Sequence, residues 1–329
     1  MFKQMMGLAA AWPFASYFWE KKREAKFWEE NCLSWNPPPA IGQTKQLEIL
    51  PLIDWYAAND SLDTEPGVSY LVKTDDNTIL FDLGYNVKQE HPSPLMKNMV
   101  KLGVRMGDID TIVISHHHVD HVGGMKNQIK GTFSLTNGPL DLSDKSIFLP
   151  PGVSRPGINT MQVNRPVKIG TGITSTGPIY SAQFLLGNTL FPMGVTPEQA
   201  LAVDVKDKGI VLIVGCGHQR LDRILKLAKN LYHKPIYGVI GGLHFPVTAS
   251  RIEKLGGRFQ VQQYLGTGRL PWDPITKDDV LEQISGLKEY DPSVVSLSAH
   301  DSCDWSLKAF KDAFGDRYHE LLVGDPIVI

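Results

Sequence analysis

The chain has 329 residues, of which 42% are hydrophobic and 21% are charged. This length is sufficient for a large hydrophobic core, in one large domain or in one domain with additions. The formal net charge of −2 at pH 7 excludes a strongly basic protein, so we expect no nucleic-acid partner.

The cysteine content predicts a reducing compartment. Cys32, Cys216 and Cys303 are far apart and odd in number, which does not indicate a disulfide framework. No apolar run reaches the roughly 20 residues that a membrane-spanning helix needs. We therefore expect a cytoplasmic protein.

Residues 1–35 form an aromatic-rich N-terminal stretch. From Met5 to Trp19 nearly every residue is apolar or aromatic, and a mixed-charge run follows from Glu20 to Lys26. The single preceding charge, the many aromatic residues and the lack of a clear A-x-A cleavage site disfavour a signal peptide. Two interpretations stay open. One is an arm that packs on its own domain or on another subunit of a homo-oligomer; the other is an interfacial helix that associates with a membrane surface.

The sequence Asn-Pro-Pro-Pro at 36–39 predicts a stiff linker, which divides the chain into an arm and linker (1–45) and a main domain (46–329). In the main domain a strand is predicted over 47–53. A hairpin is predicted over 68–82, whose second strand ends in Asp82. Ser93 as N-cap and a following proline predict a helix over 93–102.

Residues 111–124 read TIVISHHHVDHVGG. A short apolar strand leads directly into this polar run. His116 and His118 alternate, so an extended chain points both imidazoles the same way. Asp120 and His121 follow, where two glycines allow a tight turn. Imidazole and carboxylate are ligands of Zn, Mn and Fe, so this segment is sufficient to begin two adjacent metal sites.

The pattern H-x-H-x-D-H after a strand resembles the signature of the metallo-β-lactamase superfamily. The resemblance implies an α/β fold, the αββα metallo-β-lactamase sandwich, for a catalytic domain over 46–329, with the aromatic-rich N-terminal arm as an addition. Residues 94–124 resemble in particular the branch named for dihydropterin-aminobenzene-phosphate synthase. In the superfamily an aspartate at the position of Asp82 orients the metal site, because a ligating imidazole needs a partner for its other nitrogen.

Residues 125–200 are rich in Gly, Pro, Ser and Thr. Short strands and turns are predicted over 166–179. We expect this region to form much of the substrate pocket wall, because loops on a rigid scaffold usually carry specificity.

Residues 197–220 read PEQALAVDVKDKGIVLIVGCGHQR, which predicts a hairpin followed by a helix. The order E-Q-A-L, strand, G-C-x-H again resembles the dihydropterin-synthase-like branch. Cys216 stands where most superfamily members have a metal-bridging aspartate. Its thiolate could bind metal, or Cys216 could be a small buried residue with His218 as the ligand, so both are candidates.

Three further elements precede the end of the chain. A strand over 236–240 ends in Gly-Gly-Leu-His, which would place His244 at the pocket. A capping box predicts a helix over 276–287. A strand over 294–298 precedes His300. The branch has H-C-T-G here and this chain has H-D-S-C, so the histidine is kept while the branch's substrate preference does not transfer.

The resemblance assigns His116 and His118 to a first metal ion and Asp120, His121 and His300 to a second. No histidine lies between residues 122 and 217, so His218 is the expected third ligand of the first ion.

These residues predict a dinuclear metal-dependent hydrolase. Two divalent ions, with Zn expected and Mn or Fe as alternatives, would hold a bridging hydroxide that attacks a small polar ester such as a phosphate ester or lactone. Asp120 would hold the second ion and orient the nucleophile, and His244 would donate to the leaving group or a phosphate oxygen. Two alternatives remain: a synthase-like condensation that releases diphosphate, and a non-hydrolytic metal-binding or redox protein. The expected partner is a small-molecule substrate.

Overall fold

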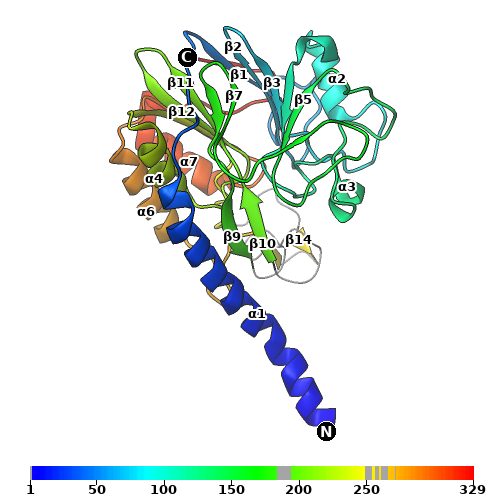
Figure 1. Cartoon of the computed structure of the whole chain (residues 1–329), viewed down its shortest axis with the longest axis vertical. Coiled ribbons are helices and arrows are strands. Elements are labelled where there is room, and N and C mark those ends of the chain that lie inside the picture. Colours follow the sequence, from blue (N-terminus) through cyan, green and yellow to red (C-terminus); the bar gives the residue numbers. More distant parts are fainter. Residues whose placement is uncertain (1, 184–193, 249–253, 256–258, 261–265, 271) are drawn as a thin grey trace.

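The computed structural model of the chain describes residues 2–183, 194–248, 254–255, 259–260, 266–270 and 272–329. Two large β-sheets pack face to face, and helices cover their outer faces (Figure 1). This four-layer α/β arrangement confirms the predicted αββα sandwich.

The first sheet has seven strands in the order β17-β1-β2-β3-β4-β5-β6. Their bounds are β1 (Leu47–Ile53), β2 (Ser69–Thr74), β3 (Thr78–Phe81), β4 (Thr111–Val113), β5 (Ser146–Leu149), β6 (Met161–Gln162) and β17 (Ile327–Val328). Strands β2 and β3 pair antiparallel, as the predicted hairpin requires, and β3 to β6 run parallel.

The second sheet has six strands in the order β16-β13-β12-β11-β8-β7. Their bounds are β7 (Val167–Gly170), β8 (Ile173–Ser175), β11 (Leu201–Val205), β12 (Gly209–Val214), β13 (Ile236–Gly241) and β16 (Val294–Leu297). Two short pairs lie outside it: β9 (Ile179–Gln183) with β10 (Gly194–Glu198), and β14 (Lys254–Leu255) with β15 (Phe259–Gln260).

Alternate residues of the central strands face different layers. On β12, Leu212 and Val214 pack against the helices, whereas Val211 and Ile213 pack against the first sheet. The helices that cover the outer face of the second sheet are α4 (Leu221–Tyr232), α6 (Lys277–Lys288) and α7 (Asp304–Phe314). On the outer side of the first sheet lie α2 (Pro94–Lys101) and α3 (Met125–Ile129). Strand β12 is buried on both faces, and its sequence is accordingly a continuous apolar run.

Two helices begin where the capping residues predict. Ser93 Oγ accepts a hydrogen bond from the backbone N–H of Met96 at the start of α2. At the start of α6, Thr276 Oγ1 accepts from the N–H of Asp279, whose carboxylate accepts from the N–H of Thr276. These local bonds satisfy N–H groups that have no partner inside the helix.

The N-terminal stretch is a single helix, α1 (Phe2–Glu30), which continues through Pro13. Its N-terminal end projects from the body of the protein (Figure 1). In its C-terminal half Tyr17 and Trp28 are buried, and Trp28 and Cys32 belong to the core cluster under α4. The C-terminal half of the arm therefore packs on its own domain.

Contact of residues 1–35 with a membrane surface or a second copy of the chain stays a prediction, as does the domain division after residue 45. In the part of the chain that the structure describes, no helix combines the length and the apolar character needed to cross a bilayer.

Two tryptophans on α1 test how this helix docks. Trp28→Ala should lower the free energy of unfolding by about 3 kcal/mol, because it empties a packed site in the core. Trp19 is 57% exposed on the same helix, so Trp19→Ala should cost less than about 1 kcal/mol. Urea unfolding followed by circular dichroism measures both. Equal effects would contradict the docking of α1.

Candidate metal centre

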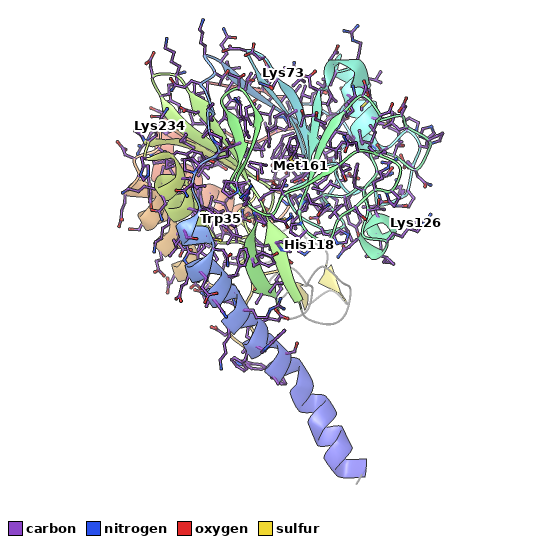
Figure 2. The ribbon with its side chains drawn as sticks, in the orientation of Figure 1. Trp35, Lys73, His118, Lys126, Met161 and Lys234 are labelled. Carbon is purple, nitrogen blue, oxygen red and sulfur yellow. The ribbon has the colours of Figure 1, made fainter. Side chains whose placement is uncertain are left out.

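Strands from both sheets end at one edge, and chemically reactive residues follow them within three positions. Asp54 follows β1, Asp82 follows β3, His116 follows β4, Cys216 follows β12, His244 follows β13, and His300 follows β16. Figure 2 shows His118 at this edge, near β9 and β10 and away from Lys73. Residues far apart in the sequence therefore meet at one place.

The predicted ligands lie in adjoining groups whose donor atoms are within 4.8 Å of one another. One group contains His116, His118 and His218; another contains Asp120, His121, Cys216 and His300; a third combines Cys216 and His218 with His244. The sulfur of Cys216 lies 3.0 Å from Nε2 of His121 and 3.1 Å from Nε2 of His300. All seven predicted ligands thus form one cluster, and their binding of metal stays a prediction.

Asp82 is fully buried and orients two of these rings. Its Oδ2 accepts the Nδ1–H of His121 at 2.7 Å and the hydroxyl of Ser115 at 2.6 Å. Because that hydroxyl hydrogen is donated to Asp82, the Ser115 oxygen accepts the Nδ1–H of His116 at 2.9 Å. The Nε2 atoms of both rings are left for the cluster, which is the geometry that the predicted role of Asp82 requires.

Asp54 orients the imidazole ring of His300 in the same way, through Ser298. The hydroxyl of Ser298 donates to Asp54 Oδ2 at 2.6 Å, so its oxygen accepts the Nδ1–H of His300 at 2.6 Å. Asp54 is fully buried and lies 244 residues before Ser298. This arrangement directs Nε2 of His300 toward Cys216.

The remaining two histidines have outer partners as well. The Nδ1 of His218 donates to the carbonyl oxygen of Gly266 at 2.7 Å, which leaves Nε2 as the nitrogen with a lone pair. The Nε2 of His118 lies 3.4 Å from Thr196 Oγ1.

A buried carboxylate holds the backbone of the loop that carries Cys216 and His218. Glu198 accepts the backbone N–H groups of Cys216, Gly217 and His218, each at 2.8 Å. Burial raises the pKa of Glu198 to about 7, against the opposing effect of these hydrogen bonds. Three donors on one carboxylate fix the loop as a rigid unit.

Burial and close charges shape the protonation of the cluster. Burial acts to lower the pKa of His121, but the Asp120 and Asp82 carboxylates outweigh it and raise the pKa to about 9. Burial raises the pKa of Asp120, and burial together with the Asp120 carboxylate raises the pKa of the Cys216 thiol well above its usual range. Burial, followed by repulsion between imidazoles, lowers the pKa values of His116, His118 and His218. A divalent cation stabilises the deprotonated forms that such ligands need.

His244 has a backbone conformation unusual for a residue other than glycine. Its φ is +53°, in the left-handed region, and its backbone N–H donates to Asp301 Oδ2 at 2.9 Å. Its ring centroid lies 4.6 Å from that of His218. Asp301, where this chain departs from the H-C-T-G pattern, therefore holds the His244 loop against the cluster.

A cavity of about 180 Å³ opens beside His218 and His244. Its other lining residues include Lys21, Arg220, Thr267, Arg269, Asp279 and Glu282. The prediction that residues 125–200 form much of the pocket wall is wrong for this cavity as far as the described residues go. Its walls come instead from α1, α6, the loops after β12 and β13, and residues 266–269, because the cavity lies on the helical side of the second sheet.

Sequence reasoning missed several supporting residues. Asp54 had a usable signal, because like Asp82 it directly follows a buried strand. Ser115 and Ser298 stand one and two residues before predicted ligands. The carbonyl of Gly266 had no signal, because every residue carries one.

The residues of the cluster fit a divalent metal. The Nε2 atoms of His116 and His218 are buried and have no hydrogen-bond partner among the described residues. A buried polar atom without a partner is costly, and a bound cation would remove that cost. Imidazole, carboxylate and thiolate donors together are typical of transition-metal sites.

Comparisons with known proteins agree with this geometry. The profile of the metallo-beta-lactamase superfamily matches residues 62–127, which include Asp82 and the H-x-H-x-D-H motif. The chain is 24% identical over 239 residues to the 7,8-dihydropterin-6-methyl-4-(beta-D-ribofuranosyl)-aminobenzene-5'-phosphate synthase of Methanocaldococcus jannaschii. The alignment covers 62% of this chain and 79% of the synthase.

Two solved structures have the same fold. Tm1679, described as a metal-dependent hydrolase of the beta-lactamase superfamily, superposes with a TM-score of 0.56 at 20% identity, over 85% of this chain and 98% of that chain. The metallo-beta-lactamase fold protein YhfI from Bacillus subtilis superposes with a TM-score of 0.50 at 13% identity, over 87% of this chain and 100% of that chain. Motif, fold and relatives agree: the chain has the metallo-β-lactamase fold, its residues 62–127 match the profile of that superfamily, and its sequence is similar to the dihydropterin-aminobenzene-phosphate synthase.

Proposed function

We propose that the chain is a dinuclear metal-dependent hydrolase of a small polar ester, with a phosphate ester or a lactone as the substrate class. One observation carries this proposal: two groups of donor atoms converge side by side, and Cys216 lies within reach of members of both. Two adjacent ions recur in phosphatases and nucleases, where they stabilise both the attacking and the leaving oxygen.

Each group would hold one ion. His116, His118 and His218 would bind the first, and Asp120, His121 and His300 the second, with Cys216 beside both. Zn is the metal that we propose, with Mn and Fe as alternatives, because imidazole dominates the donor set. Bound there, the ions would lower the pKa of a water molecule to about 7 and polarise the carbonyl or phosphoryl oxygen of the substrate.

The residues of the chain supply orientation and protons. The Asp120 carboxylate lies 3.6 Å from Nε2 of His121 and is partly exposed, so it can accept a hydrogen bond from the attacking water. His244 lines the cavity beside His218, where it can donate a proton to the leaving group or a hydrogen bond to a phosphate oxygen. Asp301 fixes its backbone in the required position.

The cavity supports a small and polar substrate. Its volume of about 180 Å³ is modest, and charged side chains from Lys21, Arg220, Arg269 and Asp279 contribute to its walls. Such walls offer hydrogen bonds and ion pairs rather than a large apolar surface.

A second candidate is the condensation that gives the branch its name, in which a diphosphate leaves. The 24% identity to the Methanocaldococcus jannaschii synthase favours it. The change to Asp301-Ser302-Cys303 beside the site makes it our second choice.

The metal content of protein purified without a metal-affinity tag tests the ligand set. We expect about two transition-metal ions per chain, falling by about one in His116→Ala and in His300→Ala. His117 is buried between two predicted ligands but belongs to no donor group among the described residues, so His117→Ala is the matched control. Elemental analysis gives the counts. Unchanged metal in both ligand variants would contradict the proposal.

Asp54 provides a test that the motif alone would not suggest. Asp54→Asn should weaken the binding of one ion by about 10- to 100-fold, because His300 loses its oriented acceptor chain. Asp110, which is exposed and remote from the cluster, gives the control Asp110→Asn. Isothermal titration of metal-free protein measures both. An affinity equal to that of the unchanged chain would show that Asp54 does not orient the site.

Turnover on a panel of aryl phosphomonoesters, phosphodiesters and lactones tests the reaction class. We expect activity that a chelator abolishes and added metal restores. His244→Ala should lower kcat by about 10²- to 10⁴-fold with metal content unchanged, and the exposed His319→Ala should not. Normal turnover in His244→Ala would show that His244 has no role in catalysis. A lower metal content in this variant would show instead that His244 is a metal ligand. Reaction of a dihydropterin diphosphate with an arylamine ribotide, and no ester hydrolysis, would favour the condensation.

A further inference from the structure

A short backbone segment, residues 266–270, lies between the N-terminal helix and the metal cluster. The carbonyl oxygen of Gly266 accepts the Nδ1–H of His218 at 2.7 Å. The carbonyl oxygen of Gly268 accepts the hydroxyl of Tyr17 at 2.8 Å. The two carbonyls are two residues apart, so one short stretch joins α1 to a predicted metal ligand.

The segment packs directly on the imidazoles. A Cβ atom at Gly266 would lie 2.8 Å from Cε1 of His218 and 2.8 Å from Cε1 of His244. The φ of Gly266 is +79°, in the left-handed region that favours glycine. Backbone in this position has little freedom to move without moving the rings.

On its far side the segment is held by α1. Tyr17 is 7% exposed, and its hydrogen bond to Gly268 is buried. A buried bond of this kind is costly to lose, because the carbonyl would remain without a donor. Arg269 pairs with Asp279 of α6, so the segment is held at two points.

The helix itself is fixed by a second buried polar group. Glu24 is 4% exposed and accepts hydrogen bonds from the backbone N–H of Ala182 at 2.8 Å and from Lys21 Nζ at 3.0 Å. It also pairs with Arg223 of α4, the helix that follows the loop carrying Cys216 and His218. Lys21 lines the cavity beside His218. The docked half of α1 is therefore a wall of the candidate active site.

We propose that Tyr17 is a positioning residue for the metal centre. By holding Gly268 it places the Gly266 carbonyl, which sets the tautomer and the ring direction of His218. Ligating histidines depend on such an acceptor for their second nitrogen. This inference rests on the proposed function, because it takes His218 as a metal ligand.

The test uses the full-length variant Tyr17→Phe, which removes one oxygen atom and keeps the ring. Metal-free protein is titrated with Co²⁺, and the visible absorption spectrum reports the coordination of each ion. We expect one ion to bind about tenfold more weakly and with an altered spectrum, and the other ion to bind as in the unchanged chain.

Tyr232→Phe is the matched control. The hydroxyl of Tyr232 makes a 2.6 Å hydrogen bond to Thr174 Oγ1 at the end of α4, away from the cluster. Its loss should lower the thermal unfolding temperature in the same way as Tyr17→Phe while leaving both Co²⁺ affinities and the spectrum unchanged.

The outcomes separate this inference from the proposed function. Two ions bound by the unchanged chain, with identical Co²⁺ isotherms and spectra in Tyr17→Phe, would overturn the role of Tyr17 and leave the dinuclear site intact. Equal weakening of both ions in Tyr17→Phe and in Tyr232→Phe would also overturn it, because the effect would follow stability alone. An unchanged chain that binds no Co²⁺ would overturn the proposed function itself.

Discussion

The candidate centre depends on the pairing of each imidazole with a buried acceptor on its outer nitrogen. Asp82 takes three hydrogen bonds from Ser115 and His121, and Asp54 acts on His300 through Ser298. Both carboxylates are fully buried, where an unpaired charge would be very costly. The hydrogen bonds that remove this cost also fix the direction of the imidazole rings. The same bonds therefore stabilise the fold and preorganise the candidate metal site.

The two sheets must approach closely for this pairing to occur. A Cβ atom at Gly215 would lie 2.3 Å from Ser115 Oγ and 3.1 Å from Asp82 Oδ2, and one at Gly242 would lie 2.2 Å from the carbonyl oxygen of Gly215. Glycine at both positions lets the loop after β12 reach the loops of the neighbouring strands. Cys216 can then lie between His121 and His300.

Buried polar contacts also attach the N-terminal helix to the domain. Tyr17 and Glu24 are polar residues buried against the domain, and Trp28 completes its core. A helix attached through buried hydrogen bonds cannot move freely, so the cavity beside His218 has a defined wall. The N-terminal end of α1 extends from the body (Figure 1).

The sequence by itself determined the features that are local: the H-x-H-x-D-H segment after a strand, the helix starts at Ser93 and Thr276, and the apolar strand before Cys216. Their signals lie within a few residues, so the chain displays them directly. Only the tertiary structure decided that Asp54 supports His300 and that the Gly266 carbonyl orients His218. The bond between Asp54 and Ser298 joins residues 244 positions apart, and the bond between His218 and Gly266 joins residues 48 apart and uses a backbone group that every residue has. Both exist only once the sheets and α1 have packed.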